Sequence, residues 1–290
     1  NEGHQPELLD IRASIYKKSN LLSFLSFIKT SASRLKRMET EYGNVHFEKF
    51  INRNIEKTSK IRFGYQLNSH LDYDAYIVGS DQVWRAEYAL KVEMFFLNFV
   101  NNNSVKLSYA ASFGKSDWTY TAEQTNNCKG LISDFNAVSV REASGKELVE
   151  SKLAGSATHV LDPTMIIGIT EYNNQIDSYS DGLYSRNDVF CYVLDLNKEK
   201  QSFISAFCTE KSLNEVICNK EKGDKDKISI ENWLQGIRDS QFVITDSFHG
   251  MVFCILFEKD FIVLANNSRG YERFSSLLSQ IGLLERLVEE

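Results

Sequence analysis

The chain has 290 residues, of which 42% are hydrophobic and 25% are charged, and its formal net charge at pH 7 is -6. These proportions match ordinary globular proteins and exclude intrinsic disorder as the overall class. A mildly acidic chain with a sequence pI near 5.5 is a poor candidate for nucleic-acid binding, which usually relies on a basic domain.

The apolar stretches are short. The longest ones, such as 251–257, fall far below the ~20 residues that a membrane-spanning helix needs. The five cysteines are scattered without a CxxC pair, and two of them lie inside apolar runs. This pattern predicts reduced, buried thiols and therefore a cytoplasmic protein. No basic-then-apolar signal peptide follows the first residue, Asn1.

The first quarter of the chain is mainly helical in pattern. A short apolar run at 6–11 predicts a strand, and apolar residues at three- and four-residue spacing predict helix within 14–54. This region also holds a basic cluster, Arg34, Lys36 and Arg37. We interpret the cluster as a solvated helix face because acidic residues follow it at once, with contact to an anionic membrane as the alternative.

From residue 75 onward, compact apolar runs bounded by turn residues predict buried strands. The predicted strands are 75–78, 105–111, 137–140, 159–161, 189–194, 214–218, 242–245 and 261–265. Helical patterns lie between them, at 121–134, 143–153, 198–209, 230–239, 250–257 and 271–281. This alternation predicts an α/β fold with parallel sheets.

The best candidate for a domain boundary is the segment 161–164, which contains Pro163. The polar stretch at 171–188, which has almost no aliphatic periodicity, belongs to the same candidate boundary. We therefore predict an N-terminal α/β domain over 1–162 and a C-terminal α/β domain over 163–290.

Ligands of open α/β sheets bind at the carboxyl ends of strands, so the residues that follow each predicted strand are candidates for a site. Ser80, Asp81 and Gln82 follow a glycine that permits a sharp turn. They form either a substrate-binding loop or a capped turn between a strand and a helix. Ser112 precedes Gly114 in a run of small residues, which allows either close approach to a ligand or tight packing.

Two further strand ends carry more distinctive chemistry. Arg141 follows the strand 137–140 and suits a bidentate contact with an anion, with a surface pair to Glu142 as the alternative. The segment TDSFHG at 245–250 opens an apolar helix, whose N-terminal end attracts anions. His249 in this segment can act as a general acid or base, with a structural histidine as the alternative.

Common catalytic motifs are absent from the sequence. No HExxH, paired-cysteine, GxSxG, Walker or GxGxxG pattern occurs. Their absence argues against metal sites, the common serine hydrolases, P-loop enzymes and dinucleotide oxidoreductases as first interpretations. We expect neither a metal nor an organic cofactor.

Seven strings, in order, resemble the polysaccharide pyruvyl transferase family, in particular its bacterial capsule and exopolysaccharide branch. They are YDAYIVGSDQVW (73–84), FFLNFV (95–100), KLSYAASFG (106–114), SVREASG (139–145), VLDPTM (160–165), VITDSFHGMVF (243–253) and NNSRGYERFSSLL (266–278). No single string is decisive, but the ordered set spans most of the chain and is specific.

The resemblance implies a GT-B-like architecture, with two Rossmann-like domains facing a cleft. It implies transfer of an enolpyruvyl unit from phosphoenolpyruvate to a sugar of a cell-surface polysaccharide or its lipid-linked precursor, with a cyclic ketal as product. That chemistry demands no metal. The expected enzyme is cytoplasmic, with the inner face of the membrane as a further expectation.

The resemblance also suggests roles for the residues at the strand ends. His249 is the expected acid–base group, and Asp246 is expected to assist it. The expected donor-binding residues are Arg141, Ser247, Gly250, Arg269 and Arg273. The expected acceptor-binding residues are Ser80, Asp81, Gln82 and Ser112.

The chain departs from the family pattern in two respects. It lacks the usual first β-α unit and a C-terminal helical tail, so we expect it to be trimmed at both ends. Many relatives carry an arginine two residues before the active-site histidine, where this chain has Ser247. Arg269 and Arg273 are the expected replacements. The alternatives are a glycosyltransferase that uses a nucleotide-sugar, or a catalytically degenerate paralogue.

Overall fold

The computed structural model describes residues 3–11, 45–61, 72–89, 91–101, 103–218, 228–265 and 271–288. The chain divides into two compact units, the first made of Asn1–Asp74 and Phe99–Asn101 and the second of Ala75–Asn98 and Asn102–Glu290. Two parallel sheets lie in the second unit, which therefore carries every strand end considered above. The division of the chain into domains 1–162 and 163–290 stays a prediction.

The described part of the first unit contains helix α2 (Val45–Asn54) and an extended segment near the start of the chain. The extended segment forms two isolated parallel bridges, Leu8 to Lys57 and Ile11 to Ile61, in the region where a strand was predicted. Helix α2 lies at the end of the predicted helical region. The basic cluster of that region lies outside the described residues.

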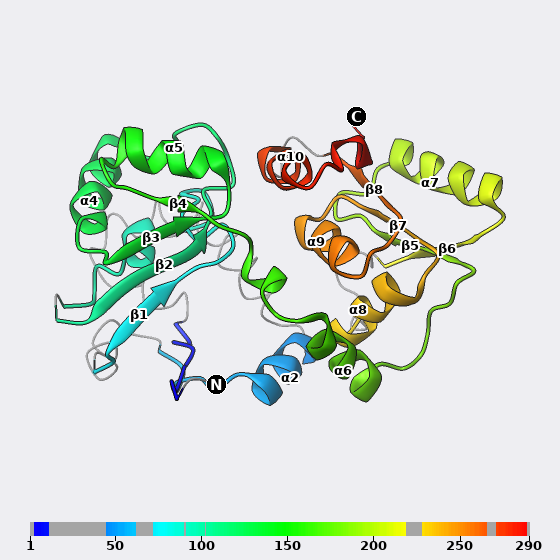
Figure 1. The fold of residues 1–290 in the computed structure, drawn as a ribbon, viewed down its shortest axis with the longest axis horizontal. Helices are drawn as coiled ribbons and strands as arrows, with labels where there is room; N and C mark the ends of the chain where they lie inside the picture. Colours follow the sequence, from blue (N-terminus) through cyan, green and yellow to red (C-terminus); the bar gives the residue numbers. More distant parts are fainter. Residues whose placement is uncertain are drawn as a thin grey trace, which may run out of the picture. The chain divides into compact units, whose positions relative to one another are not determined.

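The first sheet of the second unit has four parallel strands in the order β1-β2-β3-β4. They are β1 (Ala75–Val78), β2 (Val105–Ala111), β3 (Ala137–Val140) and β4 (Thr158–His159). Helices α4 (Ala122–Ile132) and α5 (Ala143–Lys152) connect the last three strands and lie on one side of the sheet (Figure 1). Right-handed crossovers between strands laid down in one direction place their helices on one face.

An aromatic cluster holds the loop that follows β1. Trp84 and Phe96, the last residue of the short helix η3 (Val92–Phe96), are fully buried and stack with their ring centroids 4.7 Å apart. The indole of Trp84 donates to the carbonyl of Phe95 (2.8 Å), and its own carbonyl accepts from the Tyr120 hydroxyl (2.6 Å). Buried aromatic rings with paired polar groups pack in one arrangement, so the predicted acceptor loop has a rigid support.

Two serine side chains close an irregularity between β2 and β3. The register shifts between Ser108 and Ala111. The Ser108 hydroxyl donates to the Ser139 carbonyl (3.0 Å), and the Ser139 hydroxyl donates to the Ser108 carbonyl (2.9 Å). These hydroxyls satisfy backbone groups that a bulge leaves unpaired. Beyond the bulge, the amide of Arg141 bonds to the carbonyl of Ala111 (3.2 Å), which anchors Arg141 at the carboxyl end of the sheet.

The second sheet has five parallel strands in the order β6-β5-β7-β8-β9. They are β5 (Asp188–Tyr192), β6 (Asn214–Ile217), β7 (Phe242–Thr245), β8 (Phe261–Leu264) and β9 (Leu287–Val288). The first four lie within one or two residues of the predicted strands. Strand β9 was not predicted, because two residues are too short to show a periodic pattern.

Helices cover both faces of the second sheet (Figure 1). They are α6 (Ile169–Tyr179), α7 (Lys198–Lys211), α8 (Ile230–Asp239), α9 (Phe248–Leu256) and α10 (Tyr271–Gln280), with the short helices η4 (Pro163–Met165) and η6 (Leu284–Arg286). Val189 and Cys191 of β5 pack with α7, whereas Phe190 points to the core beneath α8 and α9. A strand buried on both faces is apolar throughout, which is why these strands were recognised as compact apolar runs.

The polar stretch 171–188, interpreted as part of the domain boundary, is helical in its first half, because α6 covers Ile169–Tyr179. This helix fully buries a single side chain, Ile176, and Tyr172 packs edge-on against Phe253 with the centroids 4.9 Å apart. Apolar residues do recur at helical spacing along α6, at 169, 172, 176 and 179, but this period was missed among the polar residues. Packing against the rest of the second unit stabilises the helix.

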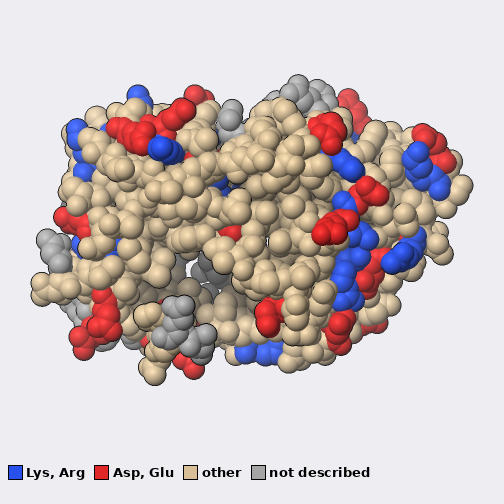
Figure 2. All heavy atoms as spheres, in the orientation of Figure 1, with Lys and Arg blue, Asp and Glu red and all other residues tan. Residues whose placement is uncertain are grey.

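Among the described residues, no helix is both long and apolar enough to cross a membrane. On the face shown in Figure 2, acidic and basic side chains of the described residues are interspersed, without an extended patch of one sign.

Candidate functional site

The turn between β7 and α9 is built from short local hydrogen bonds. Ser247 caps α9, and its hydroxyl accepts the amide of Gly250 (3.3 Å). The amide of Ser247 in turn donates to the hydroxyl of Thr245 (3.0 Å). A Cβ atom on Gly250 would lie 2.4 Å from that hydroxyl, so glycine allows α9 to start this close to the strand. Ser247 and Gly250, both predicted to bind the donor, therefore shape the turn that presents His249.

The side chain of Asp246 does not take part in presenting His249. Its side chain is fully buried, and its carboxylate accepts the backbone amides of Leu194 and Asp195 in the loop after β5. The ammonium group of Lys200 lies 3.4 Å from the same carboxylate. These contacts give Asp246 a structural partner in the neighbouring loop, and its predicted catalytic role stays a prediction.

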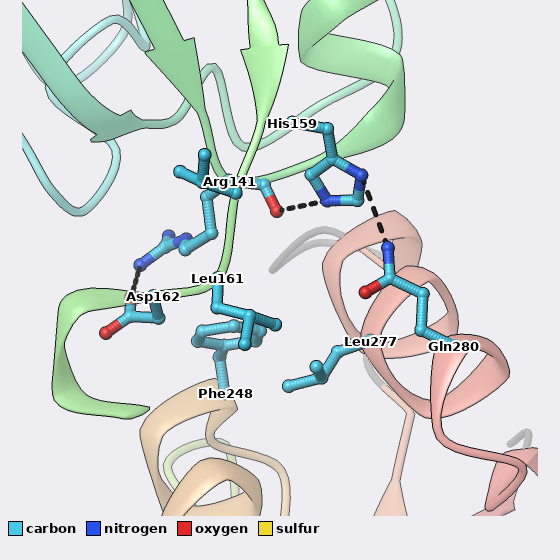
Figure 3. Close-up of a pocket in the computed structure, with 8 residues that line it drawn as sticks. Arg141, His159, Leu161, Asp162, Phe248, Leu277 and Gln280 are labelled. Carbon is cyan, nitrogen blue, oxygen red and sulfur yellow. Dashed lines mark hydrogen bonds and ion pairs between the residues drawn. The ribbon is translucent and has the colours of Figure 1, made fainter. Parts of the chain in front are cut away.

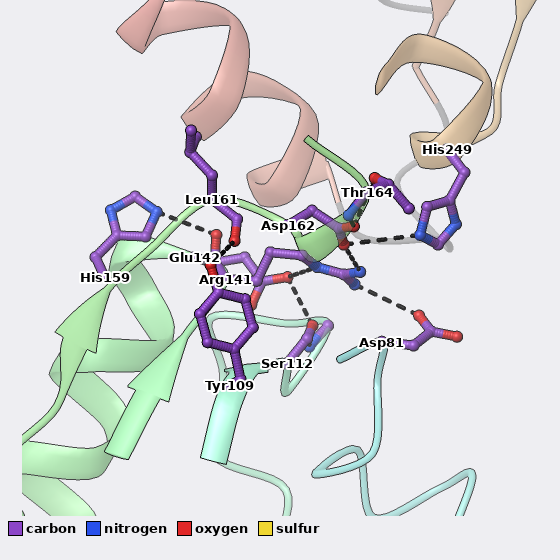
Figure 4. Close-up of polar contacts among 11 residues, drawn as sticks. Asp81, Tyr109, Ser112, Arg141, Glu142, His159, Leu161, Asp162, Thr164 and His249 are labelled. Atoms are coloured by element: carbon purple, nitrogen blue, oxygen red, sulfur yellow. Dashed lines mark hydrogen bonds and ion pairs between the residues drawn. The ribbon is translucent and has the colours of Figure 1, made fainter. Parts of the chain in front are cut away.

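Arg141 lies at the centre of a buried charge cluster (Figure 4). Its side chain is 1% exposed, and its three guanidinium nitrogens face three different carboxylates. They are Asp162 at 2.8 Å, Asp81 at 3.4 Å and Glu142 at 3.4 Å. Burial alone would lower the pKa of the guanidinium, but these carboxylates raise it above its ordinary value. The sequence-based alternative of a surface pair with Glu142 alone is therefore wrong.

Asp162 is a site residue that the sequence analysis treated only as part of a domain boundary. Its Oδ1 accepts both the amide (3.0 Å) and the hydroxyl (2.7 Å) of Thr164. Its Oδ2 accepts from Arg141, and the Nε2 of His249 lies 3.7 Å from the same oxygen. The signal was present in the sequence, since an aspartate before proline at the start of a short helix is a capping pattern.

The pKa of Asp162 reflects this setting. Burial would raise it, but His249 and Arg141 lower it well below its usual range. The carboxyl group is therefore negatively charged at every physiological pH. Because Asp162 joins Arg141 to His249, it brings together two of the groups that the sequence placed at separate strand ends.

Arg273, in α10, is a second buried guanidinium beside the first. It is 8% exposed, and its Cζ atom lies 5.4 Å from the centroid of the Phe248 ring. Its Nε atom is buried without a hydrogen-bond partner, and the side chain forms no ion pair with any described residue. Burial and the neighbouring Arg141 lower the pKa of Arg273 to about 10. The group therefore remains a cation at neutral pH.

The four predicted acceptor-binding residues do not behave alike. Asp81 has a side chain that is 66% exposed and that reaches Arg141. Gln82 accepts instead from the guanidinium of Arg85 (2.7 Å), and Ser112 is fully buried and donates to Glu142 (2.6 Å). Asp81 is thus the member of the predicted set that is both open to an incoming molecule and part of the charge cluster.

Ser80 lines a groove of about 510 Å³ on the first sheet, together with Ile77, Tyr109, Val138 and Pro163. The groove lies on the open side of the strands, and Ile77 there is 66% exposed. Arg269, the remaining predicted donor-binding residue, lies outside the described residues.

A smaller cavity lies where β4 approaches α10 (Figure 3). Arg141, Asp162, Phe248 and Gln280 are among its lining residues, but its volume of about 10 Å³ holds at most one water molecule. His159 spans this point, with Nε2 at 3.0 Å from the carbonyl of Arg141 and Nδ1 at 3.2 Å from the amide nitrogen of Gln280. These contacts brace the backbone of Arg141.

The described residues contain no group of three His, Cys, Asp or Glu side chains arranged to hold a metal ion. In the cluster one guanidinium, Arg141, faces three carboxylates, whereas Arg273 forms no ion pair with a described residue. The arrangement offers a buried cation for an anionic ligand and an imidazole beside a fixed carboxylate.

The family model of polysaccharide pyruvyl transferase matches residues 1–268 of the chain. The chain belongs to the polysaccharide pyruvyl transferase family. It is therefore a transferase enzyme, and the family implies a polysaccharide acceptor. A comparison with curated proteins found no match. The matched span of this pyruvyl transferase includes Arg141, Asp162 and His249, whereas Arg273 lies just beyond it.

Proposed function

We propose that this pyruvyl transferase takes its pyruvyl group from phosphoenolpyruvate and joins it to two hydroxyls of a saccharide as a cyclic ketal. The observation that carries the proposal is the buried Arg273 guanidinium, which has no carboxylate partner among the described residues. Burying a cation without a partner costs free energy unless a bound ligand pairs with it. Phosphoenolpyruvate has two anionic groups, a carboxylate and a phosphate.

The two arginines of the site have different roles in binding the donor. Arg141 is already matched by carboxylates, so its full charge is not available to an incoming anion. Arg273 forms no ion pair with a described residue, although Asp81 and Glu142 favour its charge from a distance, and it lies against the same ring, Phe248. We assign one anionic group of the donor to Arg273. Arg141 reaches the donor when the exposed side chain of Asp81 turns away from it.

The proposed reaction begins with proton transfer from His249, as its imidazolium, to the methylene carbon of the donor. The neighbouring carbon becomes cationic, and the oxygen of the first sugar hydroxyl bonds to it while its proton returns to the imidazole. The bond from that carbon to the phosphate oxygen then breaks, and phosphate leaves with the electron pair. The second hydroxyl oxygen closes the ketal, and its proton passes to the departing phosphate. A single acid–base group of this kind contributes about 100- to 10,000-fold to the rate.

The same proposal includes the places where the acceptor and the donor bind. We assign the acceptor to the half carrying Asp81, over 1–162, and the donor to the half carrying His249 and Arg273, over 163–290, as in a GT-B-like enzyme. The support is that Asp81 follows a strand of the first sheet, whereas His249 and Arg273 belong to helices of the second. The expected acceptor is a saccharide of a bacterial cell-surface polymer or its lipid-linked precursor. The expected setting is the cytoplasm, without a cofactor.

The test compares two donors by their effect on the melting temperature. Phosphoenolpyruvate is expected to raise it, because a ligand that binds only the folded state stabilises that state. A nucleotide-sugar is the matched alternative, since a glycosyltransferase would respond to it instead. Release of inorganic phosphate from phosphoenolpyruvate, dependent on added saccharide, completes the test. A melting temperature unchanged by phosphoenolpyruvate, or raised by the nucleotide-sugar alone, would overturn the proposal.

A further inference from the structure

We propose that Asp162 is a positioning residue for His249 and orients the imidazole ring through its Nε2. The role in proton transfer rests on the proposed function, whereas the pairing of the two side chains is testable without substrate. The sequence offered no reason to connect these residues, which lie in the linker after β4 and in the first turn of α9.

The hydrogen-bond capacity of Asp162 supports the pairing. A carboxylate has about four acceptor positions. Two, on Oδ1, are taken by the amide and hydroxyl of Thr164, and a third, on Oδ2, by Arg141. The remaining capacity of Oδ2 lies toward His249, whose Nε2 is 3.7 Å away. This separation is an ion-pair distance, and the His249 side chain is partly exposed.

The frame around Asp162 keeps the carboxylate in this orientation. The residue caps η4 and is followed by Pro163, whose ring restricts the backbone. The carbonyl of Thr164 accepts the hydroxyl of Tyr172 (2.8 Å), and the ring of Tyr172 packs on Phe253 of α9. The turn that carries the carboxylate is therefore tied to the helix that carries the imidazole.

A competing interpretation is that Asp162 serves only Arg141. Arg141, however, has two further carboxylates, Asp81 and Glu142. Among the described residues, the carboxylate that faces His249 is Asp162 alone. A carboxylate held in place beside an imidazole fixes the direction of the ring, and an acid–base group must be oriented toward the atom it protonates.

The test of the pairing is a double-mutant cycle on melting temperature, without ligand. The four proteins are the wild type, Asp162→Asn, His249→Ala and the double variant. We expect the loss in the double variant to be smaller than the sum of the single losses, by about 2–4 °C at pH 6.0. The cycle is repeated at pH 8.5 as a second, independent condition.

The matched control is the same cycle with Asp81→Asn in place of Asp162→Asn. Asp81 also pairs with Arg141, and the loss of melting temperature in Asp81→Asn is expected to add to the loss in His249→Ala. If Asp162→Asn does not fold, Thr164→Val replaces it, because this change removes a hydroxyl that orients the carboxylate. Additive losses for Asp162 or Thr164 at both pH values would overturn the pairing.

The activity test separates the role from the pairing. Asp162→Asn is expected to lower kcat with phosphoenolpyruvate about 100-fold, the low end of what one acid–base group contributes, with little change in KM. Adding Asp162→Asn to the His249→Ala variant should lower kcat little further. An equal loss in both backgrounds would contradict the positioning role. A wild type that does not turn over phosphoenolpyruvate would overturn the proposed function and this role in proton transfer, while the stability cycle would still decide the pairing.

Discussion

Arg141 and Arg273 lie against one aromatic ring, with their Cζ atoms 4.6 and 5.4 Å from the centroid of Phe248. The two guanidinium groups nevertheless differ in their carboxylate partners. Arg141 faces three carboxylates, whereas Arg273 has no ion pair with any described residue. Two neighbouring cations repel each other when desolvated. Keeping the two guanidinium groups close together costs free energy, and a bound anionic donor would reduce this repulsion.

The first prediction concerns donor affinity. Arg273→Gln is expected to weaken binding of phosphoenolpyruvate by about 10- to 100-fold, because hydrogen bonds to charged groups contribute about 1.5–3 kcal/mol. Titration calorimetry measures the change. The control is Arg238→Gln, since Arg238 is already paired with Asp177 and Asp239. Equal affinities of the Arg273 variant and the wild type would rule out this contact.

The second prediction concerns stability without donor. Arg273→Met is expected to raise the unfolding free energy by about 1–3 kcal/mol, because it removes a buried charge that no described residue pairs. Arg238→Met, which removes a paired charge, should not stabilise the protein. Urea unfolding of both variants makes the comparison. A loss of stability in Arg273→Met would show that the guanidinium is satisfied within the protein.

The third prediction concerns the turn that presents His249. Gly250→Ala is expected to lower the unfolding free energy by about 1–3 kcal/mol, since the added Cβ would lie 2.4 Å from the Thr245 hydroxyl. Gly130 offers a matched control, because it lies in helix α4 with no atom within 4 Å of an added Cβ. Gly130→Ala should stabilise by about 0.5–1 kcal/mol. Similar effects at the two positions would contradict the steric argument.

The fourth prediction concerns acid. The pKa of Asp162 is lowered in the folded protein, so its charge stabilises the fold above its unfolded pKa of about 3.9. That contribution is lost as the pH falls through the lower folded value. The wild type should therefore exceed Asp162→Asn in unfolding free energy between about pH 5 and 7. Denaturant unfolding should show this difference narrowing below about pH 4, and a difference independent of pH would count against the charged carboxylate.

Most of the fold in the second unit could be predicted from local patterns. Strands β5, β7 and β8 are apolar on both faces because helices cover both sides, and such runs are visible without any tertiary information. Strand β9 could not be predicted in this way, because two residues show no period. Helix α6 does carry apolar residues at helical spacing, at 169, 172, 176 and 179, but they are few among polar residues and were missed.

The site was predicted as a set of strand ends but not as a set of contacts. Arg141 and His249 both face the carboxylate of Asp162, and Asp81 faces Arg141. Asp246, next to His249 in the same turn, instead bonds to the loop after β5. Adjacent residues in a turn point in different directions, so chain position alone does not reveal which partner each side chain meets.

The sequence by itself determined the family, the alternation of strands and helices, and the strand ends at which charged side chains occur. These depend on local periodicity, turn residues and ordered motifs, which are written along the chain. Only the tertiary structure decided that Asp162 joins Arg141 to His249 and that Arg273 is left without a carboxylate among the described residues. Pairing of charges depends on distance and burial between residues far apart in the chain, and both arise only when the sheets are packed.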